Sequence, residues 1–145
     1  MPFAVYSLPD THTVYNHPAV GRKVLSDEEN GGGQISIAYS QDMSNHMQTA
    51  SGYTVINKVK SHAGTVTLEI PQNSPSDMYL RRVIAYLENA AASEFAQSTL
   101  TIRDTAADIT FNCTGVTPQK RPDRAYAQQA GTLQYVLLCA SIVET

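Results

Sequence analysis

Histidines and clustered carboxylates are the residues of this chain best suited to metal binding or acid–base catalysis. The histidines are His12, His17, His46 and His62, and the carboxylates gather at Asp27, Glu28 and Glu29. A metal site needs several ligands that converge on one point, and a general acid needs burial that shifts its pKa. His12 and His17 fall in a predicted turn without a nearby acid on a rigid element, and glycines follow the acidic run. We expect structural histidines, exposed or half-buried, and no catalytic residue, metal site or cofactor.

Two cysteines, Cys113 and Cys139, lie in predicted strands with apolar or mixed surroundings. Without a Cys-x-x-Cys spacing they do not predict a zinc site, and no nucleophile-elbow motif marks a serine or cysteine nucleophile. A disulfide would form only if their strands are neighbours. The favoured interpretation is a reduced pair of small core residues.

A basic cluster lies between two predicted strands and consists of Lys120, Arg121 and Arg124, interrupted by Pro122 and Asp123. A nucleic-acid surface would combine such cations with aromatic side chains, and here only Tyr126 follows. The net charge of −3 also argues against a protein that coats nucleic acid. The cluster is better interpreted as a turn whose charges pair with a neighbouring chain.

The composition predicts one mainly β domain. The chain has 145 residues, 42% hydrophobic and 16% charged, which suits a single core within residues 1–145. We divide it into an irregular amino-terminal segment, residues 1–33, and a core, residues 34–145. The longest apolar run, Tyr135–Ala140, is too short to span a bilayer, and Met1–Leu8 lacks the pattern of a secretion signal. We therefore expect no membrane insertion.

Alternating polar and apolar residues predict a series of short strands. The clearest is a hairpin in which residues 34–40 and 44–49 pair around a turn at Gln41–Met43. The other predicted strands are Thr13–Tyr15, Ala19–Leu25, Tyr53–Lys58, Gly64–Ile70, Ser98–Arg103, Asp108–Cys113 and Thr132–Val143.

One amphipathic helix is predicted from Pro75 to Ser93. Ser74 and Pro75 form a start signal, and an apolar stripe follows at helical spacing through Leu80, Val83, Ile84, Leu87 and Ala91. The last strand, by contrast, is apolar on both faces. We expect a helix or a neighbouring subunit to cover its second face, which carries Leu138.

The charge distribution marks the predicted hairpin, because no lysine or arginine occurs between Val24 and Asn57. Its polar face would carry Gln34, Ser36, Ser40 and Asp42. A smooth face without cations would let DNA pass without sticking, because neutralising phosphates is what makes DNA binding tight. The residues alone favour the plainer alternative, a solvent-facing hairpin.

Five segments, taken in order, resemble the tail tube proteins of contractile-tailed bacteriophages. They are His62–Ile70 followed by Asn73-Ser74-Pro75, the helix, Leu100–Thr105, Lys120–Asp123, and Tyr126-Ala127 with a last strand led by Gly131. The resemblance covers about residues 33–143, and its specificity comes from the ordered set. Tyr135 stands where the family's last strand usually has tryptophan.

The resemblance implies an antiparallel β-sandwich or partial barrel with one flanking helix and an extended hairpin. Six copies would form a ring, and rings would stack into the inner tail tube through which phage DNA passes during ejection. Tubes of type VI secretion have a similar fold. The implied partners are other copies of the chain and the sheath, tape-measure and baseplate proteins of the tail. The protein would be made in the host cytoplasm and reside in the virion, without enzymatic activity.

Strand parity then places the surfaces of such a subunit. The lumen-facing residues would be Gln34, Ser36, Ser40 and Asp42. The loop Met43–Gly52 would stack rings through Met43, His46, Met47 and Ser51. The inter-subunit residues would be Asp27, Glu28, Glu29, Lys120, Arg121, Arg124 and Leu138.

Two other classes of protein remain open. A tail terminator or a head–tail joining protein would also form a β-rich ring but would stop at one ring. A monomeric binding module or an unrecognised enzyme would not assemble at all.

Overall fold

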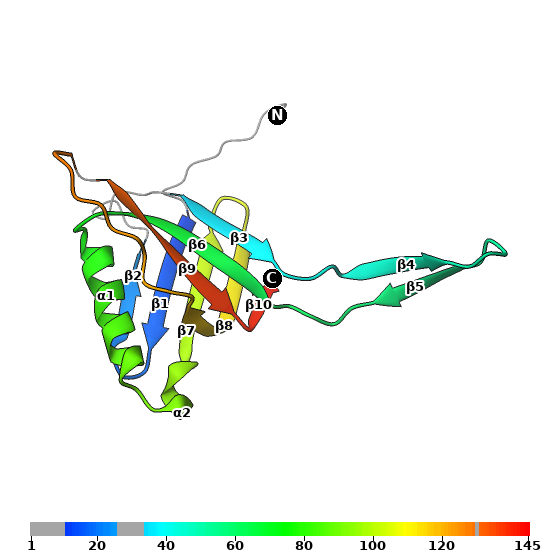
Figure 1. Ribbon diagram of the computed structural model, residues 1–145, viewed down its shortest axis with the longest axis horizontal. Helices are drawn as coiled ribbons and strands as arrows, with labels where there is room; N and C mark the ends of the chain where they lie inside the picture. Colours follow the sequence, from blue (N-terminus) through cyan, green and yellow to red (C-terminus); the bar gives the residue numbers. More distant parts are fainter. Residues whose placement is uncertain (1–10, 26–33, 130) are drawn as a thin grey trace.

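The computed structural model describes residues 11–25, 34–129 and 131–145 (Figure 1). Asp27, Glu28 and Glu29 lie outside the described residues. The strands are β1 (Thr11–His17), β2 (Gly21–Val24), β3 (Ile35–Tyr39), β4 (Ser44–Gln48), β5 (Thr54–Lys58), β6 (Gly64–Pro71), β7 (Ser98–Asp104), β8 (Ile109–Pro118), β9 (Thr132–Cys139) and β10 (Ser141–Glu144). The helices are α1 (Pro75–Glu88) and α2 (Ala92–Phe95).

Eight strands form one antiparallel sheet in the order β2-β1-β7-β8-β9-β6-β3, with β10 beside β8. The predicted mainly β fold is confirmed. The sheet folds over so that β6 and β9 cross the β1–β7–β8 half (Figure 1). Its two end strands, β2 and β3, are not paired with each other, and α1 contacts both β2 and β6. The result is a partial barrel with the helix on its open side.

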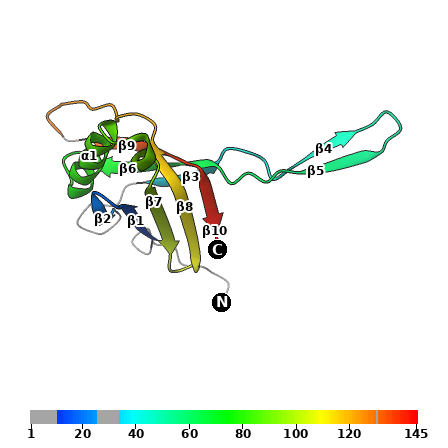
Figure 2. The same ribbon diagram turned by 90° about the horizontal axis from the view of Figure 1, so that it is seen from below.

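Strand β8 belongs to both halves of the sheet. Its first part pairs with β10, and its end pairs with β9 through Thr117 and Pro118. Figure 2 shows β7, β8 and β10 side by side. Between the two parts lies Gly115, with a φ of 63° and a register shift opposite β7. A Cβ there would lie 2.7 Å from the Cβ of Ala140. Gly115 thus permits both the left-handed backbone and the close approach of the β9–β10 junction.

Helix α1 forms because its start is well capped and one face is apolar. The Ser74 hydroxyl accepts from the amide of Asp77 at 3.3 Å, and Pro75 occupies the first helical turn. The stripe predicted from the sequence lies in the core, apart from Ala91. The helix ends at Glu88 and not at Ser93, because Asn89 caps it and Ala91 is extended, with φ −65° and ψ 155°.

The amino-terminal strands are part of the core. β1 pairs with β7 along six residues, and Tyr15 is buried, so the described part of residues 1–33 is not an irregular appendage. His17 is also buried, contrary to the expected exposed turn. Its Nδ1 accepts from the amide of Ala19 at 3.1 Å, and its Nε2 lies 3.0 Å from the carbonyl of Glu94. Because a carbonyl only accepts, Nε2 is the donor and the ring is the neutral tautomer.

The predicted last strand is divided in two. β9 ends at Cys139, Ala140 interrupts the strand, and its amide donates to the carbonyl of Thr114. β9 lies beside β6, whereas β10 continues beside β8. The division accounts for the burial of Ile142, which belongs to β10, whereas Val136 and Leu138 stay on the outer face of β9.

The predicted hairpin of residues 34–40 and 44–49 is wrong. β3 pairs with β6, and β4 pairs with β5 around a turn at Gly52, whose φ is 84°. β4 and β5 form a separate two-stranded ribbon that projects away from the body in both views (Figures 1 and 2). An extended hairpin is present, but it lies one strand further along the chain.

Replacing Gly115 by alanine tests the bend of β8. Gly115→Ala should lower the free energy of unfolding by about 1–3 kcal/mol, because the new Cβ meets Ala140 and the backbone stays left-handed. Gly131→Ala is the matched control, since nothing lies within 4 Å of the Cβ that it adds. Urea unfolding measures both variants, and equal midpoints would contradict the role of Gly115.

Candidate assembly surfaces

The ribbon of β4 and β5, called here the hairpin, has two distinct faces. Residues paired across the ribbon share a face. The first face carries the pair Asn45–Asn57, in which the side-chain amide of Asn57 donates to Asn45 Oδ1 at 2.8 Å. That face also carries the pair Met47–Val55. Tyr53 precedes β5, and its carbonyl accepts from the amide of Thr49. The opposite face carries the pairs Ser44–Lys58, His46–Ile56 and Gln48–Thr54.

Exposed apolar side chains are concentrated on the hairpin. Met47 is 57% exposed, Tyr53 70% and Ile56 67%. Residues 43–57 contain no aspartate, glutamate, lysine or arginine. Projecting strands are normally protected from other chains by charged residues. Apart from Lys58 at its base, the ribbon is uncharged and partly apolar and pairs with no other strand of the described chain, which is the composition of a buried interface.

Strand β3 presents a second open surface at the end of the main sheet. The amide of Glu69 donates to the carbonyl of Gln34, and the amide of Ser40 donates to the carbonyl of Ala63. By alternation, the main-chain groups of Ile35, Ile37 and Tyr39 point to the other edge, where no strand of the described chain lies. That edge can therefore accept a strand from another molecule.

The predicted lumen residues are exposed at or beside β3. Gln34 precedes the strand, Ser36 lies in it, and Ser40 and Asp42 lie between β3 and β4. Ile35 and Ile37, on the other face, pack against the core. The predicted stacking residues Met43, His46, Met47 and Ser51 are also exposed. Their assignment to lumen and ring contacts stays a prediction.

The basic cluster lies in the loop of residues 119–129, called here the strap. Arg121 Nε is 2.9 Å from Glu88 Oε1 at the end of α1, and both side chains are largely exposed. Arg124 is 18% exposed and lies 2.9 Å from Asp77 Oδ1 at the start of α1. The strap is thus attached to both ends of the helix within one chain. The inter-subunit role of Lys120, Arg121 and Arg124 stays a prediction.

Asp77 is the most deeply buried charged residue of the described chain. Its Oδ1 accepts hydrogen bonds from Tyr135 on β9 and from Arg124, and its Oδ2 accepts from the amide of Asn73 at 3.1 Å. Burial would raise the pKa of Asp77, but these hydrogen bonds outweigh it and hold that pKa below its usual range. Burial and the Asp77 acceptor raise the pKa of Tyr135. One carboxylate therefore joins the helix, the strap and β9.

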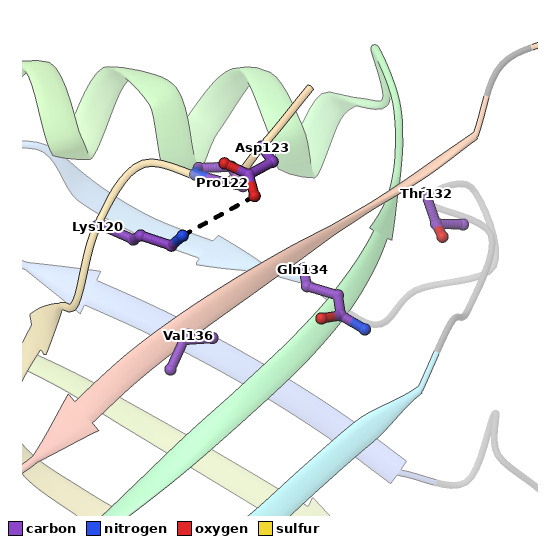
Figure 3. Close-up of a pocket in the computed structure, with 6 residues that line it drawn as sticks. All are labelled: Lys120, Pro122, Asp123, Thr132, Gln134 and Val136. Atoms are coloured by element: carbon purple, nitrogen blue, oxygen red, sulfur yellow. Dashed lines mark ion pairs between the residues drawn. The ribbon is translucent and has the colours of Figure 1, made fainter. Parts of the chain in front are cut away.

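A small cavity of about 240 Å³ lies between the strap and the outer face of β9. Figure 3 shows Lys120 and Asp123 facing each other there, with Nζ 3.8 Å from Oδ2. Thr132, Gln134 and Val136 of β9 line the other side. Leu138, further along this face, is 40% exposed. The second face of β9 is thus open, and an inter-subunit role for Leu138 stays a prediction.

The described residues contain no group of three or more histidine, cysteine, aspartate or glutamate side chains positioned to hold a metal ion. Cys113 and Cys139 are buried free thiols, and their redox state stays a prediction. Within the described ranges, no helix has both the length and the apolar character needed to cross a bilayer.

Solved structures with this fold come from contractile injection systems. The chain is similar to the sheath/tube terminator of the extracellular contractile injection system PVC in its extended state, with a TM-score of 0.60 and 12% identity over 100% of this chain and 97% of that one. It is also similar to the tube terminating cap of the anti-feeding prophage, with a TM-score of 0.57, 11% identity and coverage of 100% and 95%. For a chain of the PVC sheath-tube complex in its extended state the values are 0.55, 12%, 97% and 92%.

The chain belongs to the family described as Bacteriophage PhiTE tail tube protein, whose model matches residues 3–145. It is therefore a structural, tail tube-related protein of the phage virion. The predicted resemblance to phage tail tube proteins is confirmed. No curated protein matches the chain.

Two features of these surfaces are absent from the sequence-based predictions. Tyr53 and the β5 residues Val55 and Ile56 are not predicted to belong to the hairpin, although Gly52 after Ser51 is a turn signal that would place them there. The role of Asp77 is the second such feature. No sequence signal indicates that Arg124 and Tyr135 converge on it.

Replacing Asp77 by asparagine tests the buried network. Asp77→Asn should lower the free energy of unfolding at pH 7 by about 3 kcal/mol, because it leaves Arg124 without its partner. Since the folded pKa of Asp77 lies below its ordinary value of about 3.9, its contribution is complete above pH 4 and is lost as the pH falls through the folded value. Urea unfolding at pH 7 and at pH 3 measures both effects.

Glu88→Gln is the control for this prediction. It breaks the exposed pair with Arg121 and should change stability far less than Asp77→Asn does, because solvent screens exposed ion pairs. Equal losses in the two variants, or an unchanged acid dependence in Asp77→Asn, would contradict the role of Asp77.

Proposed function

We propose that this protein is the subunit of a tail tube in which hexameric rings stack and DNA passes through the central channel. The observation that carries the proposal is the hairpin, because it is an exposed two-stranded ribbon that has no partner strand in the described chain and whose one Lys, Arg, Asp or Glu residue is Lys58 at its base. An isolated hairpin is marginally stable in water, so a projecting ribbon of this kind needs a neighbour. Membership of a tail tube family supports a neighbour of the same kind.

Open strand edges support a ring. β3 ends the sheet with an edge that no strand of the described chain covers, so a contact in which the next copy covers that edge would remove it. Head-to-tail contacts of this type produce a closed ring when the rotation from one copy to the next is a whole fraction of a full turn. In our proposal six copies close the ring, and the sheet halves carrying β3 form its inner wall.

The proposed channel surface consists of Gln34, Ser36, Ser40 and Asp42. None of these side chains carries a positive charge. Residues 34–57, which include β3, β4 and most of β5, contain no lysine or arginine. Such a surface offers no positive charge to neutralise DNA phosphates, so it would not retain DNA. The residues thus act as a smooth wall, and we propose no enzymatic activity.

The proposed partners are the sheath, the tape-measure protein and the baseplate of a contractile tail. Related folds occur in chains from the PVC sheath-tube complex and from the six-fold symmetrised anti-feeding prophage baseplate, the latter with a TM-score of 0.56 and 8% identity. In this proposal the subunit is made in the cytoplasm of the host bacterium and is incorporated into the virion tail.

A tube terminator is the second candidate function. Two of the similar structures are a sheath/tube terminator and a tube terminating cap. A terminator would share the ring but present only one stacking surface. The length of the assemblies therefore separates the two functions.

Electron microscopy of the purified protein at high concentration tests the proposal. We expect rings with sixfold end views that stack into hollow tubes. Leu138→Asp should remain folded, because Leu138 is 40% exposed, but should not assemble if the outer face of β9 meets another subunit. Uniform single rings would favour the terminator, and small particles without rings would contradict both functions.

Chemical labelling tests the channel surface. In Ser36→Cys, the new thiol should react with both a small maleimide and a long polyethylene glycol maleimide while the protein is unassembled, because Ser36 is exposed. In tubes the small reagent should still react, and the long one should be at least about tenfold slower, because it enters a narrow channel poorly. Equal rates for the long reagent in both states would place Ser36 on the outside.

A further inference from the structure

Cys113 and Cys139 lie on either side of the bend of β8. Cys113 belongs to the part of β8 that precedes Gly115, and Cys139 is the last residue of β9. The amide of Ala140 donates to the carbonyl of Thr114 at 3.1 Å, so the residues that follow the two cysteines are joined through their backbones. β8 and β9 are also neighbours in the sheet. The condition that the sequence sets for a disulfide, neighbouring strands, is therefore met.

Both cysteine side chains point into the core, where their sulfur atoms interact. Cys113 and Cys139 are buried, whereas Thr114 is exposed, as alternation along a strand requires. The Cys113 thiol donates to Cys139 Sγ. The Cys139 thiol in turn lies 3.9 Å from the carbonyl oxygen of Leu137, to which it donates. The sequence contains no third cysteine, so each thiol has one partner in its own chain with which it can form a disulfide.

The hydrogen bond makes the two thiols chemically different. It favours the thiolate of Cys139 and lowers the pKa of Cys139, which burial alone would raise. The same hydrogen bond and burial raise the pKa of Cys113. Because oxidants react with the thiolate and not with the thiol, Cys139 reacts first and Cys113 keeps its proton for a second step.

We propose that Cys113 and Cys139 are a redox-active pair that hydrogen peroxide converts to a disulfide in the folded protein. In the first step, the thiolate of Cys139 takes one oxygen of the peroxide and becomes a sulfenic acid, and the hydroxide that leaves takes up the proton that Cys139 lost. In the second step, Cys113 Sγ attacks Cys139 Sγ, and the Cys113 proton leaves with the sulfenic hydroxyl as water. Two thiols lose two electrons in total, and one peroxide is reduced to two waters.

The disulfide braces the bend of β8, because it joins the strand before Gly115 to the end of β9. Disulfides are rare in reducing cytosol and persist in oxidising environments, which include the surfaces of virions. This chain is a phage virion protein, and in our account the pair is reduced during synthesis and closes after the virion is released. That timing rests on the proposed synthesis in the host cytoplasm, whereas the oxidation of the pair does not.

Peptide mapping of the oxidised full-length protein tests the inference. Folded, reduced protein is treated with hydrogen peroxide, the peroxide is removed, remaining thiols are blocked, and trypsin is added without reductant. Cleavage after Lys120 and Arg124 places the two cysteines in separate peptides, residues 104–120 and 125–145, neither of which contains methionine. We expect the two peptides to be joined, with a mass about 2 Da below their sum, and to separate when the disulfide is reduced.

Cys113→Ala is the matched control. Its sulfenic acid at Cys139 has no thiol in the same chain to condense with, so dimedone should capture it at least about tenfold more than in wild-type protein. Wild-type protein whose thiols stay free while it is folded would overturn the inference, as would equal capture in the two proteins. A cross-link that forms only in urea would also overturn it, because the folded core would then not bring the sulfur atoms together.

Urea unfolding tests the bracing of β8. Oxidised wild-type protein should unfold at a higher urea concentration than reduced protein, because the cross-link restricts the unfolded chain. Peroxide-treated Cys139→Ala, which controls for oxidation of methionine, should show no such rise. An unchanged or lower midpoint in wild-type protein would overturn the bracing. Rings without the disulfide would leave the proposed function standing, and the disulfide without rings would leave this inference standing.

Discussion

The bend of β8 is the constraint on which the architecture depends. The strand pairs with β10 before Gly115 and with β9 after it, so the sheet changes direction and stays continuous. This allows β6 and β9 to cross the other half and enclose the core residues Val66, Leu100 and Leu137. It also leaves β3 at the end of the sheet, from which the chain continues into the hairpin. The surfaces that we propose for assembly are thus a consequence of where the sheet folds.

The buried carboxylate of Asp77 fixes the remaining part of the body. An uncompensated charge in this position would be strongly unfavourable, so Tyr135, Arg124 and the amide of Asn73 have to meet it together. That requirement sets the position of the strap relative to α1 and β9. A loop of residues 119–129 without regular secondary structure therefore keeps a defined path across the outer face.

Local patterns in the sequence predicted the elements well, and pairing less well. The helix start at Pro75 and the alternation of β6 depend on nearby residues, and both were predicted correctly within a residue. The pairing of β3 with β6, across the whole hairpin, depends on contacts distant in sequence, and the adjacent pairing with β4 was predicted instead. Strand parity still placed Ser36 and Ser40 on the exposed side, because a strand keeps its two faces whichever neighbour it has. The convergence on Asp77 could not be predicted, since its three elements meet only in the folded chain.

Hydrogen exchange of the hairpin amides tests most directly the claim that another copy covers the hairpin. In the soluble subunit, amides of β4 and β5 should exchange quickly, because a lone two-stranded ribbon opens readily. In assembled protein the same amides should slow by at least about tenfold, while those of β1 and β7 serve as the protected reference in both states. Exchange of the hairpin that is equally fast in the subunit and in the assembly would contradict the claim.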